Sequence, residues 1–369
     1  MEIGELLDLM VEKEASDLHI KPQRPPLYRI YGKIMPLDEI PPFTNEKTEG
    51  FAFSLMNQAQ LDKFNTRHWT DLSYSHKKNR FRVNIYTEKG NVSLCIRKIQ
   101  QETPTVDQLG LPSILKDIVS YSTGLILVTG PTGSGKSTTL AALIEEINQN
   151  VPCHIATIED PIEYVFYDKK ATISQREIGS DVVSYEDSLP PLLRQDPDVI
   201  LIGEMRDRET IEIALKAAEA GHLLLSTLHT NSAASTMDRI LSYFPSDMYS
   251  QIRIELAMTL RAVVSQRLIR RMDGSGRVAA LEVMINSPTI KDLIEKGRFS
   301  EIYKVIEGSV YHYKMQTLEQ ALVALLINGV ITQEDAYSSA NNPNALRSII
   351  HEFGMKKEEK KEEIVIEGG

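Results

Sequence analysis

The chain has 369 residues, of which 42% are hydrophobic, so it can bury a core in each of two or three domains. Its formal net charge of −10 argues against a dedicated nucleic-acid-binding protein. No apolar run approaches the roughly 20 residues that cross a bilayer, and the acidic start lacks the basic flank of a secretory signal, so any membrane role is expected to be peripheral. The spacing of Cys95 and Cys153 suits neither a metal site nor a redox pair, which indicates two buried thiols in a reducing cytosol.

Residues 1–100 are expected to form a small mixed domain. The apolar spacing predicts a first helix over about Ile3 to Glu14 and a second helical stretch around 51–64. Strand-like pieces are DLHIK (17–21), PLYRIYGKI (26–34), TDLSYS (70–75), NRFRVNIYTEKG (79–90) and NVSLCIRKI (91–99). The last two alternate polar and apolar residues on either side of Lys89-Gly90, which predicts a β-hairpin.

The rest of the chain changes in pattern after a polar stretch broken by Pro and Gly at 101–112, which we interpret as an interdomain linker. Residues 113–285 alternate short apolar runs with helical stretches, the runs being 125–129, 155–158, 199–202 and 223–227. This alternation predicts a parallel sheet covered by helices on both faces. Residues 286–352 are expected to be helical, for example at 317–328, and the charged end, 353–369, is expected to be a disordered tail.

The stretch GPTGSGKST follows the apolar run LILVT and precedes an amphipathic helical stretch. It consists of Gly130, Pro131, Thr132, Gly133, Ser134, Gly135, Lys136, Ser137 and Thr138. Glycines let successive backbone N–H groups turn inward toward an anion, and the start of the following helix favours negative charge. Lys136 would place a cation on the phosphates, and the Ser137 hydroxyl is a ligand for Mg²⁺. The alternative is a chance match in a glycine-rich turn, but the strand before it and the helix after it indicate a nucleotide site.

Two acidic stretches follow predicted strands and qualify as partners of the phosphate loop. In LIGEMRDRE (201–209), Glu204 is expected at the carboxyl edge of the sheet and is the candidate for the Mg²⁺ shell. In TIEDPIEY (157–164), Glu159, Asp160 and Glu163 lie within five residues and supply a candidate general base. Pro161 turns the chain here, so these carboxylates need not point the same way. The alternative is a helix N-terminus that carries acids.

Histidines bracket the predicted strand in AGHLLLSTLHT (220–230). His222 precedes the strand and His229 follows it. A histidine at a strand end is usually a hydrogen-bonded structural residue, but His229 is placed so that it could sense the γ-phosphate. Both interpretations stay open at this point.

Taken together, these stretches resemble the ATPases of type II secretion and type IV pili. GPTGSGKSTT resembles the Walker A motif of that family, TIEDPIEY its aspartate box, LIGEMRD its Walker B motif and AGHLLLSTLHT its histidine box. The likeness extends to SDLHI, RFRVN, SQRLI, GSGRVAALEV and MQTLEQAL, and so covers nearly the whole chain.

Within that family the chain resembles the pilus retraction branch. Assembly ATPases usually carry an extra N-terminal domain and a four-cysteine zinc site, and this sequence has neither feature. The stretch TIKDLIEKGRF (289–299) stands where retraction ATPases usually have an AIRNLIRE-like stretch, so the choice between the principal retraction motor and an accessory paralogue stays open.

The resemblance implies a cytoplasmic homohexamer at the inner face of the bacterial inner membrane, with a PAS-like N-terminal domain on a RecA-like P-loop core and nucleotide between them. It implies ATP and Mg²⁺, an inner-membrane platform protein as partner and pilin as an indirect one, without zinc or nucleic acid. By the same resemblance Glu163 acts as the base, Glu159 being the alternative. Arg82 in HKKNRFR and Arg97 in IRK are the foremost candidates for an arginine that stabilises the transferred phosphoryl group, and the alternative for each is a solvated basic hairpin. The competing functions are a pilus assembly or secretion ATPase, a RecA-like DNA motor and a nucleotide-binding regulator without turnover.

Overall fold

The computed structural model describes residues 1–37, 40–99 and 102–352. By its contacts the chain divides into two compact units. The first unit consists of Met1–Thr103, Asp160–Phe166 and Arg176–Ser184, and the second consists of Pro104–Glu159, Tyr167–Gln175 and the chain from Tyr185 onward. The predicted tail, 353–369, and residue 101 of the predicted linker lie outside the described residues.

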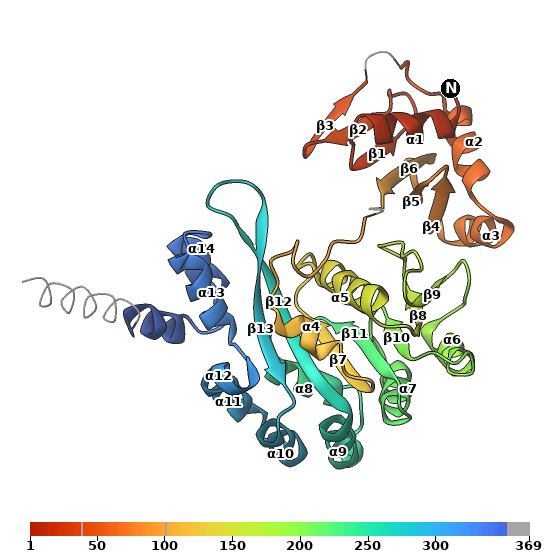
Figure 1. Ribbon diagram of the computed structural model, residues 1–369. Coiled ribbons are helices and arrows are strands. Elements are labelled where there is room, and N and C mark those ends of the chain that lie inside the picture. The colour runs from red at the N-terminus through yellow and green to blue at the C-terminus, as the bar shows by residue number, and fades with distance from the viewer. Residues whose placement is uncertain (38–39, 100–101, 353–369) are drawn as a thin grey trace, which may run out of the picture. The chain divides into compact units, whose positions relative to one another are not determined.

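The first unit is an antiparallel sheet covered by helices (Figure 1). Its elements are α1 (Ile3–Glu12), β1 (Asp17–Ile20), β2 (Leu27–Ile30), β3 (Lys33–Pro36), α2 (Asn45–Leu55), α3 (Gln58–Arg67), β4 (Trp69–His76), β5 (Asn79–Glu88) and β6 (Asn91–Lys98), and the strand order is β3-β2-β1-β6-β5-β4. In the middle of β5 the alternate residues Phe81, Val83 and Ile85 are fully buried. α1 buries Leu6, Leu7 and Met10 in the same core. Alternation in the strand and helical spacing in α1 therefore supply the two sides of one core.

The predicted hairpin is confirmed. β5 and β6 pair in antiparallel register with Glu88 opposite Asn91, and the two turn residues both have positive φ, +52° at Lys89 and +78° at Gly90. A two-residue turn with this geometry matches the right-handed twist of the strands it joins. The segment 26–34 differs from the single piece expected, because a turn at 31–32 divides it into β2 and β3. The helical stretch around 51–64 is likewise divided between α2 and α3, since Asn57 caps the start of α3.

The second unit is built on a mixed sheet with the strand order β13-β12-β7-β11-β10-β8-β9. Its strands and the helices among them are α4 (Ile114–Ile118), β7 (Gly124–Thr129), α5 (Lys136–Asn150), β8 (His154–Glu159), β9 (Thr172–Glu177), α6 (Tyr185–Leu192), β10 (Val199–Ile202), α7 (Arg208–Glu219), β11 (Leu223–Leu228), α8 (Ala233–Leu241), η1 (Ser246–Met248), α9 (Tyr249–Thr259), β12 (Leu260–Arg270) and β13 (Arg277–Ile285). Neighbouring pairs from β12 through β8 are parallel. Every residue of β7, β10 and β11 is buried, which requires cover on both faces of the sheet. The predicted mixed α/β fold with a parallel core sheet is confirmed.

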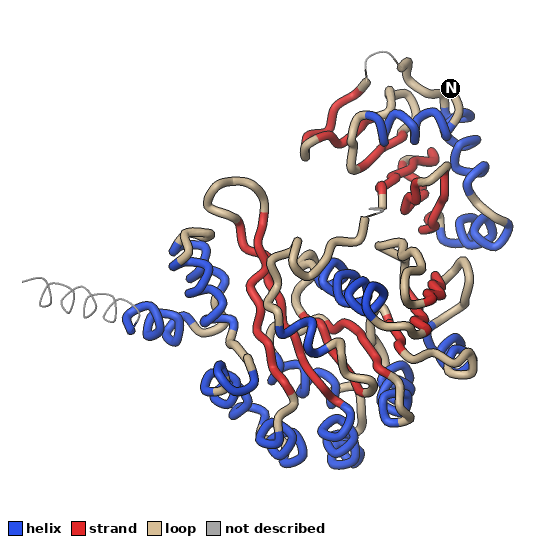
Figure 2. Tube along the Cα trace, in the orientation of Figure 1, coloured by secondary structure: helices blue, strands red, loops and turns tan. Residues whose placement is uncertain are grey.

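The C-terminal part of the second unit is helical, as expected (Figure 2). It contains α10 (Pro288–Lys296), η2 (Phe299–Glu301), α11 (Ile302–Gly308), α12 (Val310–Tyr313), α13 (Leu318–Ile327), α14 (Gln333–Ser339) and a further helix that begins at residue 343. The Thr317 side chain caps the start of α13 by accepting a hydrogen bond from the Gln320 N–H. None of the helices within the described ranges combines the length and the hydropathy that a bilayer crossing needs.

The boundary between the units differs from the predicted one. Residues 160–166 and 176–184 lie between core strands in the sequence and were expected in the core, yet their contacts place them in the first unit. Glu177, which is 2% exposed, explains this grouping. Its Oε2 accepts hydrogen bonds from the Arg80 guanidinium at 2.8 Å and from the Ile162 N–H at 3.1 Å. One buried carboxylate thus joins both segments to β5, a long-range pairing that no local pattern encodes.

Candidate nucleotide-binding and catalytic site

The glycine-rich stretch forms the loop that joins β7 to α5. Gly130 and Gly135 have φ of +148° and +86°. A Cβ atom on Gly130 would lie 2.4 Å from the Gln266 carbonyl oxygen, and one on Gly135 would lie 2.8 Å from Gln266 Nε2. Both the backbone conformation and the space therefore require glycine at these two positions. The predicted context, a buried strand before the loop and a helix after it, is confirmed.

The start of α5 is suited to bind an anion. The helix is 15 residues long, and its N-cap residue is Gly135, which has no side chain to satisfy the first N–H groups. Lys136 is only 9% exposed and its Nζ donates hydrogen bonds to the carbonyl oxygens of Gly130 at 2.9 Å and Pro131 at 3.2 Å. The ammonium group therefore lies against the loop. Pro131, Thr132 and Gly133 are exposed at its tip, Ser134 is buried, and Ser137 and Thr138 are half-buried in the first turn of the helix.

Gln266 on β12 is a further residue of this site, which none of the sequence motifs predicted. Its Nε2 donates to the Ser134 carbonyl oxygen at 2.7 Å, and its Oε1 accepts a hydrogen bond from Thr139 Oγ1 at 2.6 Å. Because Gln266 is 3% exposed, these bonds are made without competition from bulk water. A glutamine in the middle of an apolar strand is the signal that could have identified it, since a buried amide needs specific partners.

Glu204 and His229 come together at the carboxyl edge of the sheet. They follow β10 and β11, which are parallel neighbours with Ile202 opposite Ser226. The Nε2 of His229 lies 3.2 Å from Glu204 Oε1, and Arg206 Nε donates to Glu204 Oε2 at 2.8 Å. Since Leu228 of β11 is also opposite Thr129 of β7, the phosphate loop begins at this same edge.

His222 lies at the opposite end of β11. Its Nδ1 is 2.7 Å from the Pro197 carbonyl oxygen, a hydrogen bond that fixes the entry to the strand. The two histidines of the same motif therefore have different surroundings, and only His229 is near the phosphate loop's edge of the sheet.

Glu159 is the last residue of β8 and is 8% exposed. Its Oε1 accepts hydrogen bonds from Thr157 Oγ1 at 2.7 Å and from Gln175 Nε2 at 3.1 Å. β8 pairs in parallel with β10, and the Gly203 N–H donates to the Ile158 carbonyl oxygen at 2.9 Å. Glu159 therefore lies at the same sheet edge as the Glu204 loop.

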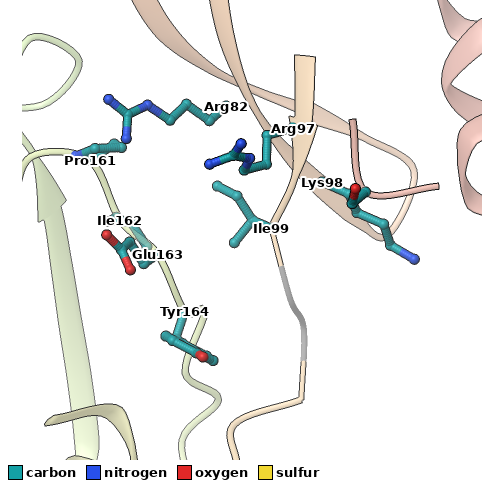
Figure 3. Close-up of a pocket in the computed structure, with 9 residues that line it drawn as sticks. Arg82, Arg97, Lys98, Ile99, Pro161, Ile162, Glu163 and Tyr164 are labelled. Carbon is teal, nitrogen blue, oxygen red and sulfur yellow. The ribbon is translucent and has the colours of Figure 1, made fainter. Parts of the chain in front are cut away.

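Glu163, four residues later, belongs to the first unit. It lines a pocket of about 350 Å³ together with Arg82, Arg97 and Tyr164 (Figure 3). The figure shows both arginines, from β5 and β6, on one side of the pocket and residues 161–164 on the other. The acidic box is thus divided, because Glu159 is grouped with the second unit and the residues from Asp160 to Phe166 with the first.

The arginines of this pocket belong to a row of charges across the first sheet. Asp17 of β1 is opposite Arg29 and Arg97, and Arg97 is opposite Arg82. Arg97 Nε donates to Asp17 Oδ1 at 2.7 Å, and Arg29 Nε lies 3.4 Å from Asp17 Oδ2. Burial of Asp17 favours its neutral form, but the hydrogen bonds from Arg97 and Ser16 and the charges of both arginines outweigh burial and lower the pKa of Asp17. The same hydrogen bond raises the pKa of Arg97, and the charge of Glu163 adds to this.

Arg82 differs from its neighbour in the row. Both arginines are exposed, but within the described residues no carboxylate lies at salt-bridge distance from Arg82. The like charge of Arg97 directly opposite is unfavourable for Arg82 unless an anion is present. Arg97 is engaged by Asp17, whereas Arg82 is available to a ligand.

Comparison with known proteins shows the family to which this chain is related. The family described as "Type II/IV secretion system protein" matches residues 3–365. The type IV pilus ATPase PilU of Pseudomonas aeruginosa is 42% identical over 351 residues, covering 95% of this chain and 91% of PilU. The type IV pilus retraction ATPase PilT of the same organism is 41% identical over 346 residues, covering 93% of this chain and 99% of PilT. A crystal structure of the pilus retraction motor PilT with bound ADP superposes with a TM-score of 0.88 and 42% identity, covering 94% of this chain and 99% of that one.

Proposed function

This chain belongs to the type II/IV secretion system protein family, and we propose that it is an ATPase motor that powers retraction of type IV pili. One observation carries the proposal. The start of α5, which has no side-chain cap, and the Lys136 ammonium group lie together in a chain that superposes over 94% of its length on a retraction motor crystallised with ADP, and both suit a phosphate. Twitching motility is the expected cellular output, in keeping with a 41% identical protein from Neisseria gonorrhoeae named for it.

Residues 130–138 bind the phosphates of ATP in this proposal. Ser137 and Glu204 would hold Mg²⁺, because both present oxygen atoms, the ligands that this ion prefers. Held there, Mg²⁺ would supply positive charge to the phosphate oxygens. Glu204 is 18% exposed and already oriented by Arg206 and His229, so little side-chain entropy is lost on binding. His229 would contact the γ-phosphate. Because its ring also contacts Glu204, the position of Glu204 would depend on whether that phosphate is present.

Glu163 is the proposed general base, which accepts a proton from the attacking water. It lines an open pocket beside two arginines, so a substrate can reach it. Glu159 is the alternative, but its carboxylate is buried and accepts hydrogen bonds from Thr157 and Gln175. Replacing each in turn with glutamine separates them, because loss of the base removes phosphate release while ADP binding persists.

Arg82 is the proposed arginine that stabilises charge on the transferred phosphoryl group, supplied to a neighbouring subunit. Its exposure and the absence of a salt bridge within the described residues support this role. Arg97 is the alternative, but it is held by the buried Asp17. Stabilisation by such an arginine is worth about 10³-fold or more in the rate of other phosphoryl-transfer enzymes.

The motor would be a homohexamer on the cytoplasmic side of the inner membrane. We place the hinge between the two units in residues 101–112, where Pro and Gly interrupt a polar stretch. ATP binding and product release would alternately favour two arrangements of the units, since a ligand shifts such an equilibrium by its differential affinity. An inner-membrane platform protein would receive this motion and withdraw pilin from the fibre.

Lys136→Ala tests the proposal. The variant should release no inorganic phosphate from ATP and should not restore twitching to cells that lack the protein. Lys304→Ala, which removes an exposed lysine on α11, is the matched control and should leave both unchanged. Phosphate release at the wild-type rate by Lys136→Ala would exclude the proposed site.

A second candidate function is that of an accessory retraction ATPase. Sequence identity does not single out the retraction motor PilT, because the identities to PilU and PilT are nearly equal, 42% and 41%. The stretch at 289–299, most of which forms α10, also differs from the AIRNLIRE-like stretch of retraction ATPases. Deletion of the gene separates the functions. Loss of the principal retraction motor leaves cells with abundant pili, loss of an assembly ATPase leaves them bald, and loss of an accessory motor leaves retraction that is weakened but present.

A further inference from the structure

β12 contacts different parts of the second unit with its two faces. Successive residues of a strand point to opposite faces, so Gln266 and Arg267 diverge. Gln266 faces the phosphate loop and bonds Ser134 and Thr139. Arg267 faces the C-terminal helices, and α14 packs against this strand (Figure 1). Its guanidinium donates to the carbonyl oxygen of Ser339 and to Asn341 Oδ1.

Asn341 continues this connection to the histidine loop. Its amide oxygen accepts the hydrogen bond from Arg267 Nη2 at 2.5 Å. Its amide nitrogen donates to the Asn231 carbonyl oxygen at 3.0 Å. The main chain beside it is also held, because the Asn342 N–H donates to Oε1 of the fully buried Glu319 at 2.7 Å. One side chain of the C-terminal region thus joins β12 to the backbone two residues beyond His229.

The histidine loop has a second anchor at the start of α8. Glu282 of β13 is 3% exposed, and its Oε1 accepts a hydrogen bond from the Ala233 N–H at 2.6 Å. Ser232 caps the same helix through Ser235. Residues 231–233 are therefore fixed at both ends, by Asn341 and by Glu282. His229 extends from this fixed segment toward Glu204.

We infer that Asn341 is a positioning residue of the ATPase site, which holds the loop of His229 in place from the C-terminal helical region. This inference rests on the proposed ATPase function. Asn341 lies outside every nucleotide-binding motif of the sequence and contacts the site only through the Asn231 carbonyl oxygen. Any movement of the C-terminal helices relative to β12 is thereby transmitted to the His229–Glu204 pair, which couples the end of the chain to turnover.

Asn341→Asp isolates the proposed contact. An aspartate keeps the acceptor for Arg267 but cannot donate to the Asn231 carbonyl oxygen, so the C-terminal helices stay attached while the histidine loop is released. We expect kcat for ATP to fall roughly tenfold, because a small misplacement of a site residue is enough for such a loss. The KM for ATP should stay within about twofold, since the phosphate loop is unchanged.

Hydrogen exchange measured by mass spectrometry on the full chain supplies a second readout. Amides of residues 229–232 should exchange faster in Asn341→Asp, and those of 343–352 should exchange as in the wild type. The matched control is Asn344→Asp, the same chemical change at an exposed asparagine three residues later, and it should alter neither kcat nor exchange.

The outcomes separate this inference from the proposed function. A wild-type protein that releases no phosphate contradicts the ATPase function itself. An active wild type with unchanged kcat in Asn341→Asp overturns the positioning role. A lower kcat with unchanged exchange at 229–232, or with faster exchange across 343–352, also overturns it, because the effect would then not pass through the histidine loop alone.

Discussion

Two charged clusters of the molecule are built in opposite ways. Glu204 and His229 follow the ends of parallel strands and are partly exposed, with 18% and 45% of their side-chain surfaces accessible. Asp17 and Arg97 lie within paired antiparallel strands, as the first residue of β1 and the last but one of β6, and the Asp17 side chain is only 5% exposed. Residues at strand ends are free to exchange a protein partner for a substrate, whereas a charge buried between strands is committed to its neighbour. Arg82 is the exception in the row, since within the described residues no carboxylate lies at salt-bridge distance from it.

Replacement of Arg82 should give the largest effect and tests whether the row has a catalytic member. We expect Arg82→Ala to lower ATP turnover by about 10³-fold, because charge on the transferred phosphoryl group would lose its stabilisation. Phosphate release by the assembled protein is the measurement. Lys78→Ala, an exposed lysine near the same strand, is the control. If turnover stayed within a factor of about two of wild type, the row of charges across the first sheet would have a structural role and no catalytic one.

Glu204→Gln should give the next largest effect and tests the strand-end cluster. The amide keeps the shape of the side chain but removes the charge that orients His229 and would hold Mg²⁺. Turnover should fall by about 10²-fold, the size seen when one electrostatic group of an active site is removed. Steady-state kinetics of Glu204→Gln and of Glu209→Gln, an exposed acid on α7, supply the comparison. If Glu204→Gln lowered the thermal stability but left turnover normal, Glu204 would not belong to the catalytic site.

Glu282 is a buried carboxylate that forms no salt bridge with any residue the structure describes. Burial raises its pKa to about 7, the Ala233 N–H opposes this, and the charge of Glu319 adds to it. A raised folded-state pKa means that the stabilisation is complete below pH 4.5 and is lost as the pH rises through 7. Glu282→Gln should therefore gain roughly 3 kcal/mol in free energy of unfolding relative to wild type between pH 4.5 and pH 7.

Urea unfolding of Glu282→Gln at several pH values checks this prediction. Glu295→Gln, at an exposed position on α10, should show no such trend. A difference between Glu282→Gln and wild type that is independent of pH would mean that Glu282 has the same charge in the folded and unfolded chain.

Arg97→Ala should have the smallest effect and should act on stability. The variant leaves the buried Asp17 with Ser16 and the more distant Arg29, at a cost of roughly 2 kcal/mol. The lowered pKa of Asp17 makes this stabilisation complete at neutral pH and lost as the pH falls below 3.8. Fluorescence of Trp69, the one tryptophan of the chain, reports unfolding of the first unit, with the exposed Arg24→Ala as control. A stability equal to wild type at neutral pH would show that Arg29 alone neutralises Asp17.

The core of the fold and the phosphate loop could be predicted from local patterns. Apolar runs gave four parallel strands, because strands buried on both faces contain little else. Glu204 and His229 could be expected to meet, since the carboxyl ends of neighbouring parallel strands share one edge. β9 and the length of β12 were not predicted, because their burial depends on strands far away in the sequence.

Residue order alone determined that this chain turns through a glycine-rich loop at 130–135 and then begins a helix, since glycine spacing, the lysine and the flanking apolar runs are local properties. Only the tertiary structure decided that Glu163 lies with Arg82 and Arg97, that Gln266 supports the loop from another strand, and that Asn341 contacts the histidine loop. These pairings join residues 66 to 132 positions apart. A long-range contact is selected by the packing of whole strands and helices, and no local sequence pattern records which partners that packing brings together.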